Sequence, residues 1–343
     1  MLAEAVTGTR GAARLFPVLL LAAFGFLSQQ NARGSEQSFA VDARPIAYFR
    51  IGSKETRFGP LEFVGGLEMT SRQRDFGAIS SFRFLDSDGR FMGVADTGFW
   101  FFGRLLHDEK GLPASISDFS MMPMVDASGT PIREKWFTDA ESIALDGDEA
   151  VVGFERNHRI ARFRIEPGGM GAATAVMDFI VPTYELRSNR GFETLTRAPQ
   201  DSALAGALVA GTERSMDGQG NIFAVILEGP HRGIFTIPRR DDFDITDGAF
   251  LPNGDLLLLE RRFSMSTGVA MRLRRLPADT IRPGMIADGP VLLHADMGYQ
   301  IDNMEALDVW ERADGATMVS IMSDDNHSLL QRNLYLEFRL AEE

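Results

Sequence analysis

The stretch ITDGAFLPNGDLLLLERRFSMSTGVAMRLRRL, residues 245–276, contains one unit of a pattern that recurs along the chain. It has an acidic residue near the start of an apolar run, turns at Asn253-Gly254, and continues into four leucines that end at Glu260. A run of alternating polar and apolar residues, 270–276, follows. Short runs of this kind are typical of half-buried β-strands, and Asn-Gly supplies the positive φ angles of a tight hairpin. The stretch therefore predicts an antiparallel strand meander.

Four further segments repeat this order of an acidic opening, a turn and an apolar run that ends in Asp or Glu. With the stretch above, which extends to Leu293, they make five segments: 66–125 (GGLEM, then FMGVADTG), 139–179 (DAESIAL, then AVVGFER), 191–237 (GFETL, then ALVAGTER), 245–293, and the last from 303 (NMEALDV, then MVSIMSDDN). Asx-Gly pairs at Asp88, Asp146 and Asp314 occupy the same place as Asn253. Such a repeat indicates one supersecondary unit used several times.

A four-strand meander repeated around an axis is a β-propeller blade, so the sequence predicts an all-β fold with four-stranded antiparallel blades in one domain, residues 35–343. The repeats favour five blades, and a degenerate blade within the long first repeat would make six. The last repeat holds about three strands before the chain ends, and we expect the segment 46–51 to complete it. A pair of β-sandwiches is the alternative fold.

Residues 1–34 have the pattern of a signal peptide. Arg10 and Arg14 precede the apolar run 15–27, which is short for a membrane span and is followed at once by polar residues. Cleavage near Gly34 predicts a periplasmic or secreted protein with no stable membrane span. An uncleaved anchor is the alternative interpretation.

Charge and composition exclude several classes of partner and site. The formal net charge is −13, which disfavours nucleic acid and anionic membranes as partners. The absence of Cys excludes disulfides and thiolate sites, and the five His residues lack metalloprotease spacing. No GxSxG motif is present. We therefore expect a small-molecule partner at an oxygen-rich site, and the sequence makes no prediction of oligomeric state.

The acidic residues come in pairs, one near the start of the first strand and one at the end of the second. Both places lie at the same rim of a propeller, so we expect the pairs to converge on one mouth of the channel: Glu68 and Asp96, Glu141 and Glu155, Glu193 and Glu213, Asp247 and Glu260, Glu305 and Asp324. Carboxylates this close need compensation by arginines, shared protons or hard cations. A site rich in carboxylate oxygen suits Ca²⁺ or Mg²⁺, with Ca²⁺ favoured. Single acids of the set are equally explained as strand-end caps or ion pairs.

The motifs GGLE, VADTG, DAESIA, GFER, GFETL, LPNGDLLLLERRFS, NMEAL and SDDN together resemble the phytase-like domain family, described as having esterase-like activity of phytase. The resemblance covers residues 46–340. It implies a β-propeller whose Asp and Glu residues form the active site, and by its name it implies phosphoester hydrolysis. The chain departs from the family pattern at Ser142, Ala306 and Arg190, and Arg190 would change the charge balance of the site.

The leading hypothesis is therefore a metal-dependent hydrolase of a phosphate ester. We expect the following acids to act in catalysis: Glu141, Glu193, Glu260 and Glu305. Arg156, Arg214 and Arg261, each directly after one of the acids, would orient phosphate. The remaining acids would hold a divalent cation: Glu68, Asp96, Glu155, Glu213, Asp247 and Asp324. Two alternatives stay open, a non-catalytic binding propeller with a structural cation and a lactone or sugar-ester hydrolase.

Overall fold

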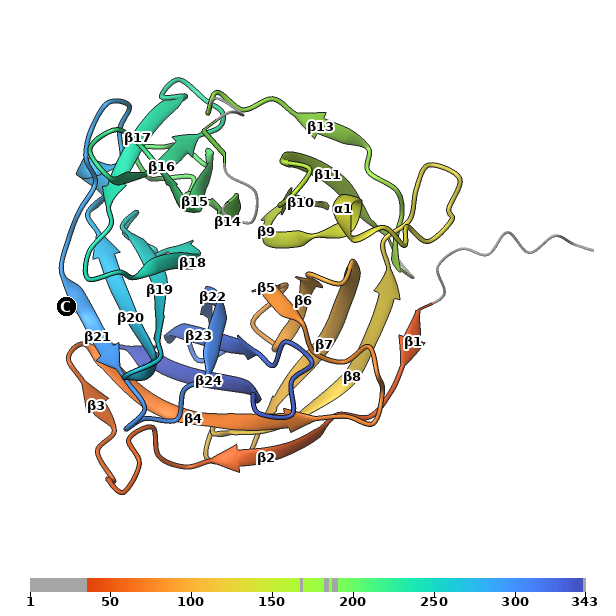
Figure 1. Ribbon diagram of the computed structural model, residues 1–343. Helices are drawn as coiled ribbons and strands as arrows, with labels where there is room; N and C mark the ends of the chain where they lie inside the picture. The colour runs from red at the N-terminus through yellow and green to blue at the C-terminus, as the bar shows by residue number, and fades with distance from the viewer. Residues whose placement is uncertain (1–35, 167–168, 182–184, 187–190, 342–343) are drawn as a thin grey trace, which may run out of the picture. The chain divides into compact units, whose positions relative to one another are not determined.

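Five antiparallel sheets are arranged around a central axis, and each sheet is one blade of a β-propeller (Figure 1). The computed structural model describes residues 36–166, 169–181, 185–186 and 191–341. Within this part of the chain, helix is limited to α1 (Lys135–Thr138) and the 3-10 helix η1 (Ala278–Thr280). No helix in these ranges is long and apolar enough to cross a membrane. The predicted all-β propeller with five blades is confirmed, and the sandwich and six-blade alternatives are wrong.

The first two blades both have extra strands at the outer edge. From the channel outward, the first blade contains β5 (Ile79–Phe84), β6 (Arg90–Ala95), β7 (Phe99–His107), β8 (Pro113–Pro123) and β1 (Gln37–Ser38). The second blade contains β9 (Ala140–Asp146), β10 (Glu149–Phe154) and β11 (Arg159–Glu166), and β11 pairs with both β12 (Gly169–Met170) and β13 (Ala175–Met177).

The next two blades are simple four-stranded meanders, and the fifth contains strands from both ends of the chain. The third contains β14 (Phe192–Arg197), β15 (Leu208–Met216), β16 (Asn221–Ile226) and β17 (Gly233–Pro238). The fourth contains β18 (Asp244–Phe250), β19 (Leu256–Ser264), β20 (Gly268–Leu276) and β21 (Val291–Ala295). The fifth contains β22 (Asn303–Glu311), β23 (Thr317–Asp324), β24 (Asn333–Leu340), β4 (Leu61–Thr70) and β2 (Asp42–Ile46), with β3 (Arg57–Phe58) paired to β4.

The ring closes through β4, and this corrects the sequence prediction in two ways. The expected closing segment 46–51 begins where β2 ends, and β2 is the outermost strand of the fifth blade. The GGLEM motif, expected to open the first blade, lies in β4 and pairs with β24. The physical reason is the edge of β24, whose free N–H and C=O groups are covered by the long β4.

The predicted Asx-Gly hairpins are present between the first and second strands of four blades. Gly89, Gly147, Gly254 and Gly315 all have φ between +63° and +89°. At Gly89 a side chain would also collide with the chain, because an added Cβ would lie 2.6 Å from the carbonyl oxygen of Leu105. These turns therefore depend on glycine for its left-handed backbone.

The apolar core is divided into five clusters of buried side chains, one at each junction between neighbouring blades. At the ring closure, for example, Phe101 of the first blade and Tyr335 of the fifth belong to one buried cluster. At the junction of the fourth and fifth blades, Leu257 and Leu336 belong to another. Side chains alternate across a strand, so each blade packs against one neighbour with each face. This arrangement leaves the polar strand ends around the channel.

Candidate functional site

Each innermost strand carries a β-bulge at the same level of the channel. In the second blade, Ala140 pairs with Phe154 and Ser142 with Gly153, so Glu141 has no partner across the pair. The other four inner strands are irregular at the equivalent residue. A bulge re-aims a side chain, and the five bulge residues all line one cavity of about 170 Å³: Ser80, Glu141, Glu193, Thr246 and Glu305.

A second tier of side chains comes from the residues that follow the bulge on the neighbouring strand. In the second blade this is Glu155, one residue after Phe154. The five equivalent residues line the same cavity: Asp96, Glu155, Glu213, Arg261 and Asp324. The two tiers together hold seven carboxylates, two hydroxyls and one guanidinium, and we call this site the acid cavity.

Seven of the ten acids predicted to converge therefore do lie around one cavity: Asp96, Glu141, Glu155, Glu193, Glu213, Glu305 and Asp324. Glu260 does not, because it pairs opposite Ile245 and the place in the second tier belongs to Arg261. Successive residues of a strand point to opposite faces, so an offset of one residue turns Glu260 away. Its two carboxylate oxygens accept from Arg272 Nε and Arg274 Nη2, each at 2.5 Å, and the side chain is fully buried.

Asp247 and Glu68 also lie outside the acid cavity. Asp247 follows the bulge residue Thr246, and its buried carboxylate is bound by Arg83 deeper in the channel. Glu68 lies on β4, the fourth strand from the channel, and its carboxylate is 4.0 Å from Arg332 Nη1. Both placements follow from long-range pairing, which decides the blade and the face to which a residue belongs.

The carboxylates of the acid cavity differ in what compensates them. Asp96 accepts from Lys135 Nζ at 2.5 Å, and Glu155 accepts a backbone N–H at 3.0 Å. Among the described residues, neither Glu141 nor Glu193 has a hydrogen bond or an ion pair. Both side chains are half-buried, and a carboxylate withdrawn from water without a partner is costly. These two side chains are therefore the best candidates for binding something that the chain itself does not supply.

The environment of the acid cavity disfavours negative charge. Burial, together with neighbouring carboxylates, raises the pKa of both Glu141 and Glu193 well above the usual range. The same causes raise the pKa of Glu155 to about 7 and that of Asp324 to about 8. Repulsion between close carboxylates favours either shared protons or a bound cation. The cavity can therefore bind a cation or hold protons near neutral pH.

Three carboxylates lie close enough to share one metal ion: Asp139, Glu141 and Glu155 offer oxygens that are all within 4.8 Å of one another. Asp139 Oδ1 is buried and accepts no hydrogen bond, and Lys135 Nζ lies 3.3 Å from it. A buried oxygen that accepts no hydrogen bond, beside an all-oxygen ligand set, fits a hard cation such as Ca²⁺ or Mg²⁺. The sequence prediction did not include Asp139, although Asp139 is the acidic residue that opens the DAESIA motif.

Two of the arginines predicted to bind substrate do not line the acid cavity and are paired with carboxylates. Arg156 Nε donates to Asp139 Oδ2 at 2.7 Å, and Arg214 Nε donates to Asp244 Oδ1 at 2.8 Å. Each pair holds its guanidinium against a carboxylate that lies outside the lining of the acid cavity. Arg190, singled out in the sequence, lies outside the described residues.

Arg261 is the arginine that enters the acid cavity itself. Its Nη1 lies 3.2 Å from Glu305 Oε1 and also bonds Asn303 Oδ1. Asn303 Nδ2 in turn donates to Glu305 Oε1 at 2.8 Å. The guanidinium is thus held in place beside the unpaired carboxylates, where it can receive an anionic group.

Below the acid cavity, a buried ion pair blocks the channel. Arg83 comes from the first blade, and its Nη1 and Nη2 donate to the two oxygens of Asp247, both at 3.0 Å. The same nitrogens donate to the carbonyls of Leu307 at 2.7 Å and Leu195 at 2.9 Å. Because these partners belong to the third, fourth and fifth blades, Arg83 joins four blades at the axis.

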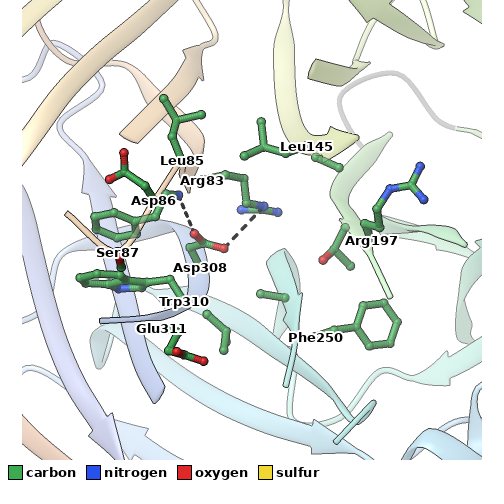
Figure 2. Close-up of a pocket in the computed structure, with 15 residues that line it drawn as sticks. Arg83, Leu85, Asp86, Ser87, Leu145, Arg197, Phe250, Asp308, Trp310 and Glu311 are labelled. Atoms are coloured by element: carbon green, nitrogen blue, oxygen red, sulfur yellow. Dashed lines mark hydrogen bonds and ion pairs between the residues drawn. The ribbon is translucent and has the colours of Figure 1, made fainter. Parts of the chain in front are cut away.

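A separate pocket of about 440 Å³ lies on the other side of this ion pair (Figure 2). Figure 2 shows Arg83 and Asp308 facing each other within it, and Arg83 Nε is 3.9 Å from Asp308 Oδ1. Phe84 and Trp310 stack beside them, with ring centroids 4.1 Å apart. Burial raises the pKa of Asp308 to about 7, against the opposing charge of Arg83. The acids of the acid cavity do not line this pocket.

A model for the family "Phytase-like: Esterase-like activity of phytase" matches residues 74–327, which are 254 of the 343 residues. The chain belongs to the phytase-like family. The matched part of this phytase-like chain contains every residue of the acid cavity and ends before β24. The closing strand β4 also lies outside the matched part.

A search of the curated proteins finds no match for this phytase-like chain. Solved structures with some likeness include the PQQ-bound aldose sugar dehydrogenase from Streptomyces coelicolor, which is 12% identical with a TM-score of 0.41 and covers 83% of this chain and 99% of that chain. Another is glutaminyl cyclase from Myxococcus xanthus (11% identical, TM-score 0.44, 82% and 97% covered). A third is an endo-arabinase from Bacteroides thetaiotaomicron (11% identical, TM-score 0.48, 79% and 96% covered). These likenesses are too distant to bear on the chemistry of the acid cavity.

Proposed function

We propose that this protein is a metal-dependent hydrolase of a phosphate ester and that the reaction takes place at the acid cavity. The observation that carries the proposal is the pair of unpartnered carboxylates, Glu141 and Glu193, in a cavity that one guanidinium enters. Membership of the phytase-like family supports the phosphate ester. The ion pair between Arg83 and Asp247 closes the channel below, so substrate would enter from the open mouth.

Asp139, Glu141 and Glu155 would hold the cation, because their oxygens lie together and are all hard ligands. When bound, a divalent cation neutralises phosphoryl oxygens and makes a water molecule more acidic. Ca²⁺ is the favoured ion, since carboxylate-rich sites of flexible geometry suit it.

Glu193 is the candidate general base. It lines the cavity, it has no partner among the described residues, and burial together with neighbouring carboxylates raises its pKa well above the usual range, which makes its ionised form a stronger base than a free carboxylate. Arg261 would donate to a phosphoryl oxygen, and Glu305 would keep the guanidinium in position through the 3.2 Å contact. Glu260 takes no part in this scheme, because two buried arginines occupy both of its oxygens.

Melting curves with calcium and with chelator test the metal site. Calcium should raise the Tm of the wild type, since a ligand that binds only the folded state adds about 2.7 kcal/mol at one hundred times its Kd. Glu141→Gln should lose most of this rise and melt much like the wild type in chelator, because Gln resembles the protonated acid that burial favours. Glu311→Gln is the matched control, because Glu311 is exposed and lines the separate pocket of about 440 Å³. This variant should keep the calcium-dependent rise in Tm.

A substrate panel then separates the reaction classes. Hydrolysis of phosphomonoesters that depends on calcium and is lost in Glu193→Gln supports the proposal. Hydrolysis of lactones or sugar esters instead would assign the site to that class. A calcium-dependent Tm without any hydrolysis would make the protein a binding propeller. If neither calcium nor magnesium changes the Tm, the metal site is refuted.

We also propose that the protein is exported to the periplasm or beyond. The basic start and the short apolar run of residues 1–34, which lie outside the described residues, support this proposal. N-terminal sequencing of protein recovered from the periplasm should begin near Ser35. Recovery of the intact Met1 end from the cytoplasm would refute it.

A further inference from the structure

All five innermost strands contribute to the pocket of about 440 Å³ on the far side of the ion pair between Arg83 and Asp247 (Figure 2). The second halves of β5, β9, β14, β18 and β22 each supply part of its lining, and we call this site the rear pocket. Its volume lies within the range of small-molecule sites, about 300–1,000 Å³. The proposed hydrolysis uses none of its residues.

The floor of the rear pocket keeps hydrogen-bonding capacity that the chain does not use. The carboxylate of Asp308 has about four lone-pair sites, and the backbone N–H groups of Phe84 and Val309 occupy two of them. Within the described part of the chain, neither Arg83 Nε nor Thr196 Oγ1 makes a hydrogen bond. Thr196 is 4% exposed, and the side chains of Arg83 and Asp308 are 6% and 9% exposed. Polar groups withdrawn from water without a partner are costly, so these three side chains are candidates for contact with a ligand.

The spacing of Arg83 and Asp308 suits one hydroxyl group. Arg83 Nε and Asp308 Oδ1 are 3.9 Å apart, which is too long for a hydrogen bond. A single oxygen atom can lie about 2.8 Å from both, where it accepts from Nε–H and donates to Oδ1. An anionic ligand would be repelled by Asp308 and a cationic ligand by Arg83, so the pair favours a neutral group that both donates and accepts.

Apolar residues surround these polar groups. Figure 2 shows four of them, one from each of four blades: Leu85, Leu145, Phe250 and Trp310. Ser87 and Glu311, which are exposed, add polar groups to the lining. A ligand that matches this pocket has a neutral body with apolar faces, and it carries hydroxyl groups at both its buried and its exposed end. A sugar ring has this distribution, with C–H groups on its faces and hydroxyls around its edge.

We propose that the rear pocket binds a neutral sugar, either a monosaccharide or the terminal unit of a glycan. One hydroxyl of the sugar lies between Arg83 Nε and Asp308 Oδ1, a second bonds Thr196 Oγ1, and the ring packs against the apolar lining. The ion pair between Arg83 and Asp247 separates this site from the acid cavity. The inference therefore does not depend on the proposed function.

Calorimetric titration of the purified protein with glucose, galactose, mannose and xylose tests the site. At least one of these sugars should bind with saturation. Thr196→Val should weaken that binding about fivefold, the usual contribution of one neutral hydrogen bond, and should fold normally because the lost hydroxyl has no partner in the described chain. Leu85→Trp should weaken binding further, since the larger ring fills part of the pocket from a position that is 37% exposed. Thr236→Val, at a half-buried threonine of β17 outside the pocket, is the matched control and should bind like the wild type.

Two further titrations exclude rival explanations. Glu193→Gln should bind the sugar like the wild type, and a loss of binding in this variant would place the sugar in the acid cavity and overturn the proposal. Cyclohexanol has a ring of the same size with one hydroxyl and should bind more weakly than the sugar, so equal or tighter binding of cyclohexanol overturns the assignment to sugars. Absence of saturable binding of all four sugars, or equal affinity of the wild type and Thr196→Val, also overturns the proposal and leaves water as the occupant of the pocket.

Discussion

The central ion pair offers the sharpest test of how the propeller is held together. Arg83 is 5% exposed, and both of its terminal nitrogens donate to Asp247 and to main-chain carbonyls of other blades. Arg83→Met removes the charge and keeps most of the side-chain volume. The substitution leaves Asp247 buried without its cation and leaves the carbonyls of Leu195 and Leu307 without a donor.

The expected loss is about 3–5 kcal/mol of unfolding free energy, the usual cost of removing one partner from a buried pair. Burial already raises the pKa of Asp247. Without Arg83 this carboxyl would take up a proton, which keeps the loss at the lower end of the range. For a domain of this size the Tm should fall by roughly 10 °C.

Urea unfolding followed by tryptophan fluorescence measures the loss, and a double-mutant cycle isolates the pair. Asp247→Leu combined with Arg83→Met should be more stable than Arg83→Met alone, because the uncompensated carboxylate is gone. A loss below about 1 kcal/mol for Arg83→Met, or simple additivity in the cycle, would refute the conclusion that this ion pair holds the blades together at the axis.

Three further predictions concern pH, the displaced acid and ring closure. Folding raises the pKa of Asp308 from 3.8 to about 7, so its contribution to stability is full below pH 4 and is lost as the pH rises to 7. Asp308→Asn should therefore gain up to about 4 kcal/mol over the wild type at pH 8 and nothing at pH 4, as measured by urea unfolding at both values. Glu260→Gln should lower the Tm equally with calcium and with chelator, because it unbalances two buried arginines, and an unequal loss would point to the metal site. Removal of residues 1–53 should leave one cooperative melting transition, whereas removal of 1–70 should abolish it by exposing the edge of β24.

Local patterns in the sequence were enough to predict the class of fold and the character of the site. The repeated apolar runs and Asx-Gly turns predicted antiparallel meanders, because a hairpin depends on residues that are close along the chain. The acids at strand ends recur at one place in each repeat, which predicted that they would converge. Seven of them do so, among them Glu141 and Glu193.

Tertiary structure decided everything that depends on which residues face each other across a pair of strands. A single bulge residue shifts the register by one and reverses the face of the next side chain. In the fourth blade the acids are offset by one residue from the bulge level, so Arg261 and Thr246 line the acid cavity, while Glu260 and Asp247 are buried in ion pairs.

Long-range pairing decided the rest. The N-terminal strand β4 joins β24, nearly the whole chain away, because an open edge and an apolar blade face must be covered by whatever segment reaches them. Arg83 pairs with Asp247 across 164 residues, and Glu155 approaches Asp139 and Glu141 only when the blade folds. Sequence proximity carries no signal of such contacts, since the free energy that selects them comes from burial of apolar surface and from pairing of the charges that the closed ring removes from water.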